Sequence, residues 1–105
     1  MADRQLWTLG IWTAHPGRSE ELRAAWQGFA DWTAANVAGC GQAYLLQDAQ
    51  NPDRFISFGP WASESAAAAW RDRPEFKEFF AKVRDICVEF QPNTLWQVGQ
   101  AQGTV

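Results

Sequence analysis

Histidine, cysteine and tyrosine are scarce in this sequence, which has one His, two Cys and one Tyr. Cys40 and Cys87 are too few for a disulfide framework, and no Cys/His group has the spacing of a metal site. We expect both to be reduced, partly buried thiols in a cytoplasmic protein. Phosphate-binding loops, dinucleotide motifs and serine elbows are also missing from the sequence. The sequence therefore predicts neither a metal nor a bound cofactor.

Positive charge and long apolar runs are scarce as well. Nine Lys and Arg stand against 12 Asp and Glu, which gives a net charge of -3, and the basic residues form no stripe. Nucleic-acid binding is therefore not expected. Because no apolar run approaches the roughly 18 residues that span a bilayer, and the N-terminus has no signal-peptide pattern, no membrane association is expected either. The length predicts a single domain over residues 1–105, with a core at about 5–101.

Residue patterning predicts a sheet with helices. Four strands are expected, at 5–14, 42–48, 54–59 and 94–101. Three helical segments are expected, at 18–37, 63–73 and 74 to about 90. Ser63 is the predicted cap of the second helix, Asp72 and Glu75 the predicted capping box of the third, and Pro60 the predicted end of the third strand. The order is the ferredoxin-like β-α-β-β-α-β pattern, an α+β fold with a four-stranded antiparallel sheet.

Both faces of this predicted sheet are apolar. In the first strand, Trp7, Leu9 and Ile11 alternate with Leu6 and Trp12. Helices can cover one face only, and the other would expose an apolar patch well beyond a few hundred Å². A second copy, packed sheet to sheet with two-fold symmetry, is the simplest cover. We therefore expect an obligate homodimer that forms through the sheet faces.

Large aromatic residues are abundant, with seven Trp and seven Phe. Several are expected to point into the space between the sheet and the helices: Trp12, Trp26, Phe29, Trp32, Phe55, Trp61, Trp70, Phe76 and Phe80. Either they pack as a dense core with Ala66–Ala69 between them, or they line a cavity. The excess of Trp over Leu favours a cavity for a small hydrophobic or aromatic ligand. Candidate polar groups are Ser57, Asn36 and His15, the last being a possible base at the cavity mouth.

The segment FGPWASESAAAAWRDRPEFKEFF, with PGRSEEL before it and PNTLWQV after it, resembles the antibiotic biosynthesis monooxygenase domain. The resemblance covers roughly Leu6 to Val98. It implies that two ferredoxin-like monomers form a dimeric α+β barrel. It also implies that the protein oxidises an aromatic or quinol substrate with molecular oxygen and without a cofactor.

Site residues carry over from the family by position. In polyketide-modifying members an Asn, a Trp and a Tyr contact the substrate, and Ser57, Trp61 and Ala67 stand at these positions. In haem-degrading members an Asn, a Trp and a His act on haem, and the corresponding positions fall near Gly10 and on Trp70 and Phe80. Because Phe80 cannot ligate iron, haem degradation is not expected.

Trp61, Trp70, Ser57 and His15 are therefore the expected catalytic residues. The expected function is that of a cofactor-independent monooxygenase. Two alternatives remain open, because fold alone does not choose among functions. One is a dimer of the same fold that binds a small molecule or is purely structural, without turnover. The other is an isomerase or lyase.

Overall fold

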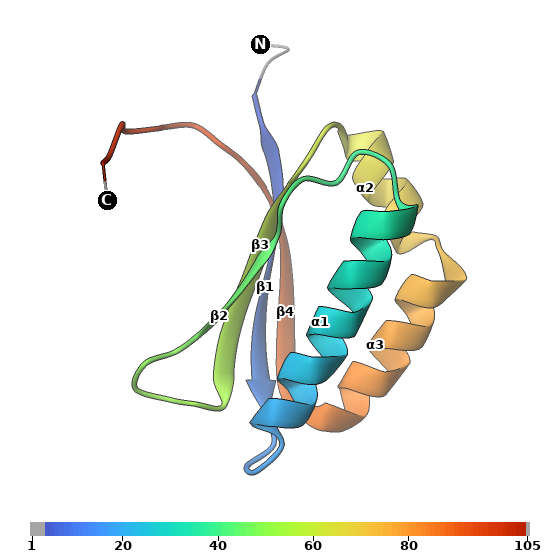
Figure 1. The fold of residues 1–105 in the computed structure, drawn as a ribbon, viewed down its shortest axis with the longest axis vertical. Coiled ribbons are helices and arrows are strands. Elements are labelled where there is room, and N and C mark those ends of the chain that lie inside the picture. The colour runs from blue at the N-terminus through green and yellow to red at the C-terminus, as the bar shows by residue number, and fades with distance from the viewer. Residues whose placement is uncertain (1–3, 105) are drawn as a thin grey trace.

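A computed structural model describes residues 4–104. Its elements are, in order, β1 (Leu6–Ala14), α1 (Ser19–Asn36), β2 (Tyr44–Gln47), β3 (Arg54–Trp61), α2 (Glu64–Arg71), α3 (Pro74–Ile86) and β4 (Cys87–Trp96). The strands form one antiparallel sheet in the order β2-β3-β1-β4. All three helices lie against the same face of this sheet (Figure 1). The predicted ferredoxin-like α+β fold is confirmed.

Strand alternation separates two sets of side chains. On β3 the buried residues are Phe55, Ser57, Gly59 and Trp61, and the residues between them are half-buried. The buried residues face the helices, where Phe55 packs with Trp12 of β1, Leu22 of α1 and Val83 of α3. Trp61 joins a second cluster with Leu6 and Ala67 of α2. These two apolar clusters hold the helices on the sheet, because burial of such side chains is the main favourable term in folding.

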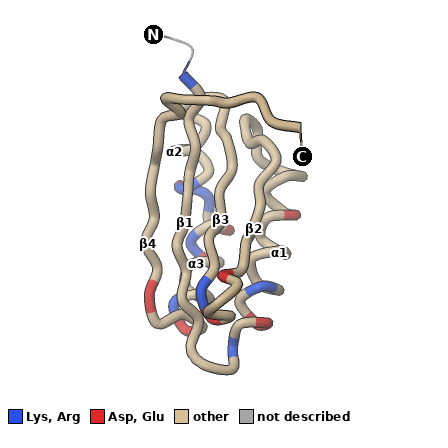
Figure 2. The backbone as a smooth tube through the Cα atoms, turned by 90° about the vertical axis from the view of Figure 1, so that its left-hand side faces the viewer, with Lys and Arg blue, Asp and Glu red and all other residues tan. Residues whose placement is uncertain are grey.

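The opposite face of the sheet is apolar and uncovered. Cross-strand pairing puts these residues on it: Trp7, Leu9, Ile11, Tyr44, Leu46, Ile56, Phe58 and Leu95. We call this set the rear face. Tyr44, Leu46 and Leu95 are 46%, 53% and 42% exposed, which is unusual for large apolar side chains. Figure 2 views this face, and charged residues on the strands lie only near its lower end.

The last strand begins earlier than its sequence pattern predicts. The helix that was expected to reach Phe90 ends at Ile86, and β4 starts at Cys87 and ends at Trp96 instead of covering 94–101. The apolar spacing continues through Phe90 because this side chain packs on Trp12 from the strand, with ring centroids 4.1 Å apart. Pro92 is tolerated in β4 because this is an edge strand, where alternate N–H groups face away from the sheet.

Two further local predictions are wrong. Pro60 does not end the third strand, which continues to Trp61 and still pairs with β1 there. The backbone of Pro60 faces the segment before β2, where its carbonyl accepts from the N–H of Gly41 at 2.9 Å, so no donor is needed from the proline. The capping box at Asp72 and Glu75 does not form: Arg73 is the N-cap of α3, without a side-chain cap bond. The predicted cap of α2 is confirmed, because the Ser63 hydroxyl accepts from the N–H of Ala66 at 3.1 Å.

Candidate functional site

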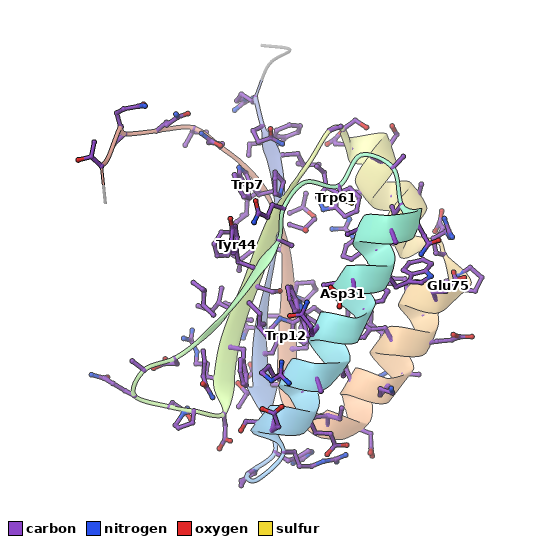
Figure 3. The ribbon with its side chains drawn as sticks, in the orientation of Figure 1. Trp7, Trp12, Asp31, Tyr44, Trp61 and Glu75 are labelled. Atoms are coloured by element: carbon purple, nitrogen blue, oxygen red, sulfur yellow. The ribbon has the colours of Figure 1, made fainter. Side chains whose placement is uncertain are left out.

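A cavity of about 560 Å³ lies between the helices and the helix-facing side of the sheet. Its aromatic walls include Trp12, Trp26, Phe29, Trp61, Trp70, Phe76, Phe79, Phe80 and Phe90. Further lining residues come from β1, α1, the segment 40–45 and β3, together with Arg71, Pro92 and Asn93. In Figure 3, Trp12 and Trp61 point into the space between the sheet and α1, whereas Trp7 and Tyr44 lie on the other side of the sheet. A largely apolar, concave site of this size is typical of small-molecule binding.

Several aromatic rings of the walls pack directly on one another. The rings of Trp61 and Trp70 are 4.8 Å apart, and Trp70 meets Phe76 edge to face at 4.7 Å. Phe29 stacks on Phe79 at 4.3 Å with nearly parallel planes. Such aromatic pairs add to the stabilisation from buried area. The many aromatic residues of the sequence therefore both pack in pairs and line a cavity.

Three indole N–H groups in these walls donate to hydroxyls. Trp12 Nε1 donates to Ser57 Oγ at 2.9 Å, Trp61 Nε1 to Thr8 Oγ1 at 3.0 Å, and Trp70 Nε1 to Thr33 Oγ1 at 3.1 Å. All six residues line the cavity. An indole can only donate, so each hydroxyl accepts and keeps its own hydrogen free to donate. The walls thus offer hydroxyl donors to a ligand that carries acceptor oxygens.

Gly10 creates the room for one of these pairs. A Cβ at this position of β1 would lie 2.9 Å from Trp12 Nε1, 2.9 Å from Phe90 Cε1 and 3.1 Å from Ser57 Oγ. Real Cβ atoms essentially never come so close, so a side chain here would displace the rings or the hydroxyl. The glycine is therefore needed for the close approach of Trp12 to Ser57.

Gly10→Ala is expected to lower the free energy of unfolding by about 1–3 kcal/mol, the usual cost of overpacking a filled site. It should also weaken ligand binding, because the displaced rings narrow the cavity. Gly28→Ala is the matched control: a Cβ on this exposed α1 residue meets no atom within 4 Å, and alanine favours a helix by up to about 1 kcal/mol. Chemical denaturation measures the free energy of unfolding of the two variants. Equal effects of the two substitutions would contradict the role assigned to Gly10.

The structure brings together most of the residues singled out by sequence. Eight of them line the cavity: Trp12, Trp26, Phe29, Ser57, Trp61, Trp70, Phe76 and Phe80. Trp32 does not; it stacks on Phe29 at 5.8 Å with Arg73 over its outer ring. Phe55 is not a wall residue either, because it is 3% exposed within the main core cluster.

Two candidate polar residues lie away from the cavity. His15 is exposed in the turn after β1, and its backbone N–H donates to the carbonyl of Ile86. Asn36 is exposed at the end of α1, where its Nδ2 donates to the carbonyl of Trp32 at 2.9 Å. Neither side chain is placed to act on a ligand inside, so the hypothesis of a histidine base at the mouth has no structural support.

Sequence reasoning missed the hydroxyl partners of two tryptophans. Thr8 shares the strand parity of Gly10 and Trp12, so alternation along β1 could have identified it. Thr33 lies in the helical stripe of α1 and is 8% exposed. The pairing of these hydroxyls with Trp61 and Trp70 depends on residues 37 or more positions away in the chain, so no local pattern could reveal it.

The described lining residues include no imidazole, and the charged ones among them are Arg23, Asp31 and Arg71. Within residues 4–104, no group of three or more His, Cys, Asp or Glu could hold a metal ion. Cys40 lines the cavity, and its Sγ donates to the carbonyl of Val37 at 3.2 Å. Cys87 lies in the core, where burial raises the pKa of its thiol to about 11, so it stays protonated at neutral pH.

Among the described residues, no helix is both long and apolar enough to cross a membrane. A search of curated proteins finds no match to the chain. Solved structures do share its fold. PA3566 from Pseudomonas aeruginosa is 21% identical with a TM-score of 0.81, over 94% of this chain and 99% of that one. Rv0793 from Mycobacterium tuberculosis is 19% identical with a TM-score of 0.81, over 93% and 99% of the two chains.

SnoaB, a cofactor-independent oxygenase from Streptomyces nogalater whose structure is that of a mutant, is 16% identical with a TM-score of 0.79 over 96% of each chain. Identities this low establish a common fold and nothing more. The family model described as antibiotic biosynthesis monooxygenase matches residues 10–82, which is more than half of the chain and includes the wall residues from Gly10 to Phe80. The chain therefore belongs to the antibiotic biosynthesis monooxygenase family.

Proposed function

We propose that the protein is a cofactor-independent monooxygenase that oxidises a small aromatic or quinol substrate in the aromatic cavity. The observation that carries the proposal is the wall itself: flat rings enclose the space, and the polar atoms that the tryptophans contact are hydroxyls. Such a site can orient a planar, electron-rich ring and exclude water from it. Family membership and the fold shared with the oxygenase SnoaB support the same reaction class.

The proposed reaction requires the side chains mainly to position the substrate. A quinol or phenol that has lost its proton to solvent can pass an electron directly to molecular oxygen, and the two radicals then combine to a peroxide. The peroxide loses its outer oxygen as water, which leaves one oxygen atom on the substrate. The protein contributes orientation and a dry environment. Trp61 and Trp70 would stack on the ring, and the Ser57 hydroxyl, whose lone pair receives the Trp12 N–H at 2.9 Å, would donate to the substrate oxygen.

Two measurements test this function. Ligands that enter the cavity should quench tryptophan fluorescence, because several indoles form its walls. A panel of quinols and phenols screened in this way should contain at least one compound whose addition also causes oxygen consumption and forms an oxygenated product. Bound ligands without any oxygen consumption would favour the non-catalytic binding protein instead. An isomerase or lyase would convert a bound ligand anaerobically.

We also propose that the protein is a homodimer in which two rear faces pack together as a dimeric α+β barrel. The exposure of Tyr44, Leu46 and Leu95 supports this. Trp7 and Tyr44 both pack against Phe58 there, at 6.1 Å and 5.7 Å between ring centroids, and form an aromatic centre that a second copy could cover. Covering apolar area gains roughly 25 cal/mol per Å², so a face of several hundred Å² would stabilise the pair strongly.

A further inference from the structure

Arg71 is a charged wall residue of the cavity without a carboxylate partner. It ends α2 and is half-buried. Within residues 4–104 its side chain makes one hydrogen bond, from Nη2 to Thr94 Oγ1 at 2.9 Å, and no ion pair. A guanidinium has five N–H donors and no acceptor, so most of its donors remain available.

The other charged wall residues differ in this respect. Arg23 is bound to Glu20, with Nη2 and Oε2 2.6 Å apart, so its charge is already compensated. Asp31 is exposed on α1 and accepts from Gln27 at 2.9 Å. Arg71 is therefore the wall cation whose charge is available to a ligand.

Two threonines on neighbouring strands lie at the guanidinium end of the wall. Thr94, which accepts from Arg71, is the direct cross-strand partner of Thr8, and such partners have Cβ atoms about 4.5–5.5 Å apart. Thr8 in turn accepts from the indole of Trp61 at 3.0 Å, so its own hydrogen is free to donate. Arg71, Thr8 and Trp61 thus form one end of the cavity, which combines a positive charge, a free hydroxyl donor and an aromatic ring.

We propose that this end of the cavity binds an anionic oxygen group of the ligand, so that the protein selects an aromatic compound bearing a carboxylate over its neutral analogue. Charge-assisted hydrogen bonds from a guanidinium to a carboxylate are roughly twice as strong as neutral ones. The ring would lie against Trp61 and Trp70 while the carboxylate meets Arg71 and Thr8. The proposal rests on the proposed function only in taking this cavity as the substrate site.

Equilibrium binding tests the proposal with two probes of the same shape. Calorimetric titration with 2-naphthoate and 2-naphthamide compares a carboxylate with its neutral amide. The native protein should bind the carboxylate about tenfold or more tightly, as expected for hydrogen bonds to a charged group. Arg71→Gln should remove about tenfold of carboxylate affinity and change amide affinity by less than about twofold.

Arg84→Gln is the matched control, because it removes the same charge from an exposed α3 residue that does not line the cavity; it should leave both affinities unchanged. Thr94→Val keeps the charge but removes the anchor of the guanidinium, and should weaken carboxylate binding alone by a few-fold. Circular dichroism verifies that each variant is folded. Equal affinity of the native protein for the two probes, or equal losses in Arg71→Gln and Arg84→Gln, would overturn the proposal.

The two proposals can fail separately. If the protein prefers the carboxylate probe but consumes no oxygen with any quinol, the anion site is supported and the oxygenase function is refuted. If the protein consumes oxygen with a quinol but Arg71→Gln leaves carboxylate affinity unchanged, the oxygenase function is supported and the anion site is refuted. If neither naphthalene probe binds, the anion site is refuted, and the oxygen assay on quinols still decides the reaction.

Discussion

Phe58→Glu is expected to convert the protein from a dimer to a monomer. Phe58 lies at the centre of the rear face, between Trp7 and Tyr44. A carboxylate there would be buried without a partner in a sheet-to-sheet dimer, and an uncompensated buried charge costs several kcal/mol. At about 4 kcal/mol the dissociation constant would rise roughly a thousandfold. Light scattering coupled to size-exclusion chromatography measures the change in mass.

The control adds the same charge on the other side of the molecule. Ala68 is an exposed residue of α2, so Ala68→Glu should remain a dimer. Circular dichroism separates dissociation from unfolding, because a dissociated subunit keeps its helices. A native protein that is monomeric at micromolar concentration would refute the dimer proposal, and so would a Phe58→Glu variant that stays dimeric and folded.

Trp70→Ala is expected to lower the rate of oxygen consumption about a hundredfold, the loss that a misplacement of about 1 Å can produce. Trp70 packs on Trp61 and Phe76 and donates to Thr33, so its removal frees three neighbours at once. Trp70→Phe keeps an aromatic ring but loses the hydrogen bond to Thr33, and its activity should lie between those of the native protein and Trp70→Ala. Initial rates of oxygen uptake with the substrate found by screening provide the measurement.

Trp96→Ala is the control for the loss of an indole outside the cavity. Trp96 is 44% exposed on β4, so its removal should leave the rate within about twofold, as for most surface substitutions. If Trp70→Ala is folded and fully active, Trp70 is no part of the site. If it unfolds, Trp70→Phe still separates packing from catalysis, because it retains most of the buried ring.

The elements that sequence predicted well are those with a strong local period. Alternation along β1 correctly assigned Trp12 and Trp7 to opposite faces, since successive strand side chains point in opposite directions. The cap at Ser63 was predicted correctly because a capping side chain bonds to a backbone N–H only three residues later in the chain. The strongest part of the resemblance to the family is the segment from β3 to α3, and the family model, which matches residues 10–82, includes most of that segment.

Other features depend on partners distant in the chain. The helical spacing of apolar residues in α3 continues in the sequence to Phe90. No residue near Cys87 indicates that the backbone becomes extended there. No local pattern singles out Arg71, because its place in the wall depends on Thr94, 23 residues later. His15 suggests a base by residue type alone, and its exposed position in the turn after β1 gives that hypothesis no support.

The alternation of β1 has a consequence for how strictly this strand must pair. Thr8, Gly10 and Trp12 face the helices, while Trp7, Leu9 and Ile11 face the rear. A slip of one residue against β3 would exchange the two sets. It would force Trp7 and Ile11 among the helices and turn Trp12 outward, away from Ser57. Register errors between β1 and β3 during folding would therefore destroy the ligand site and the contact surface together. A wild-type subunit that has lost only one of the two should not accumulate.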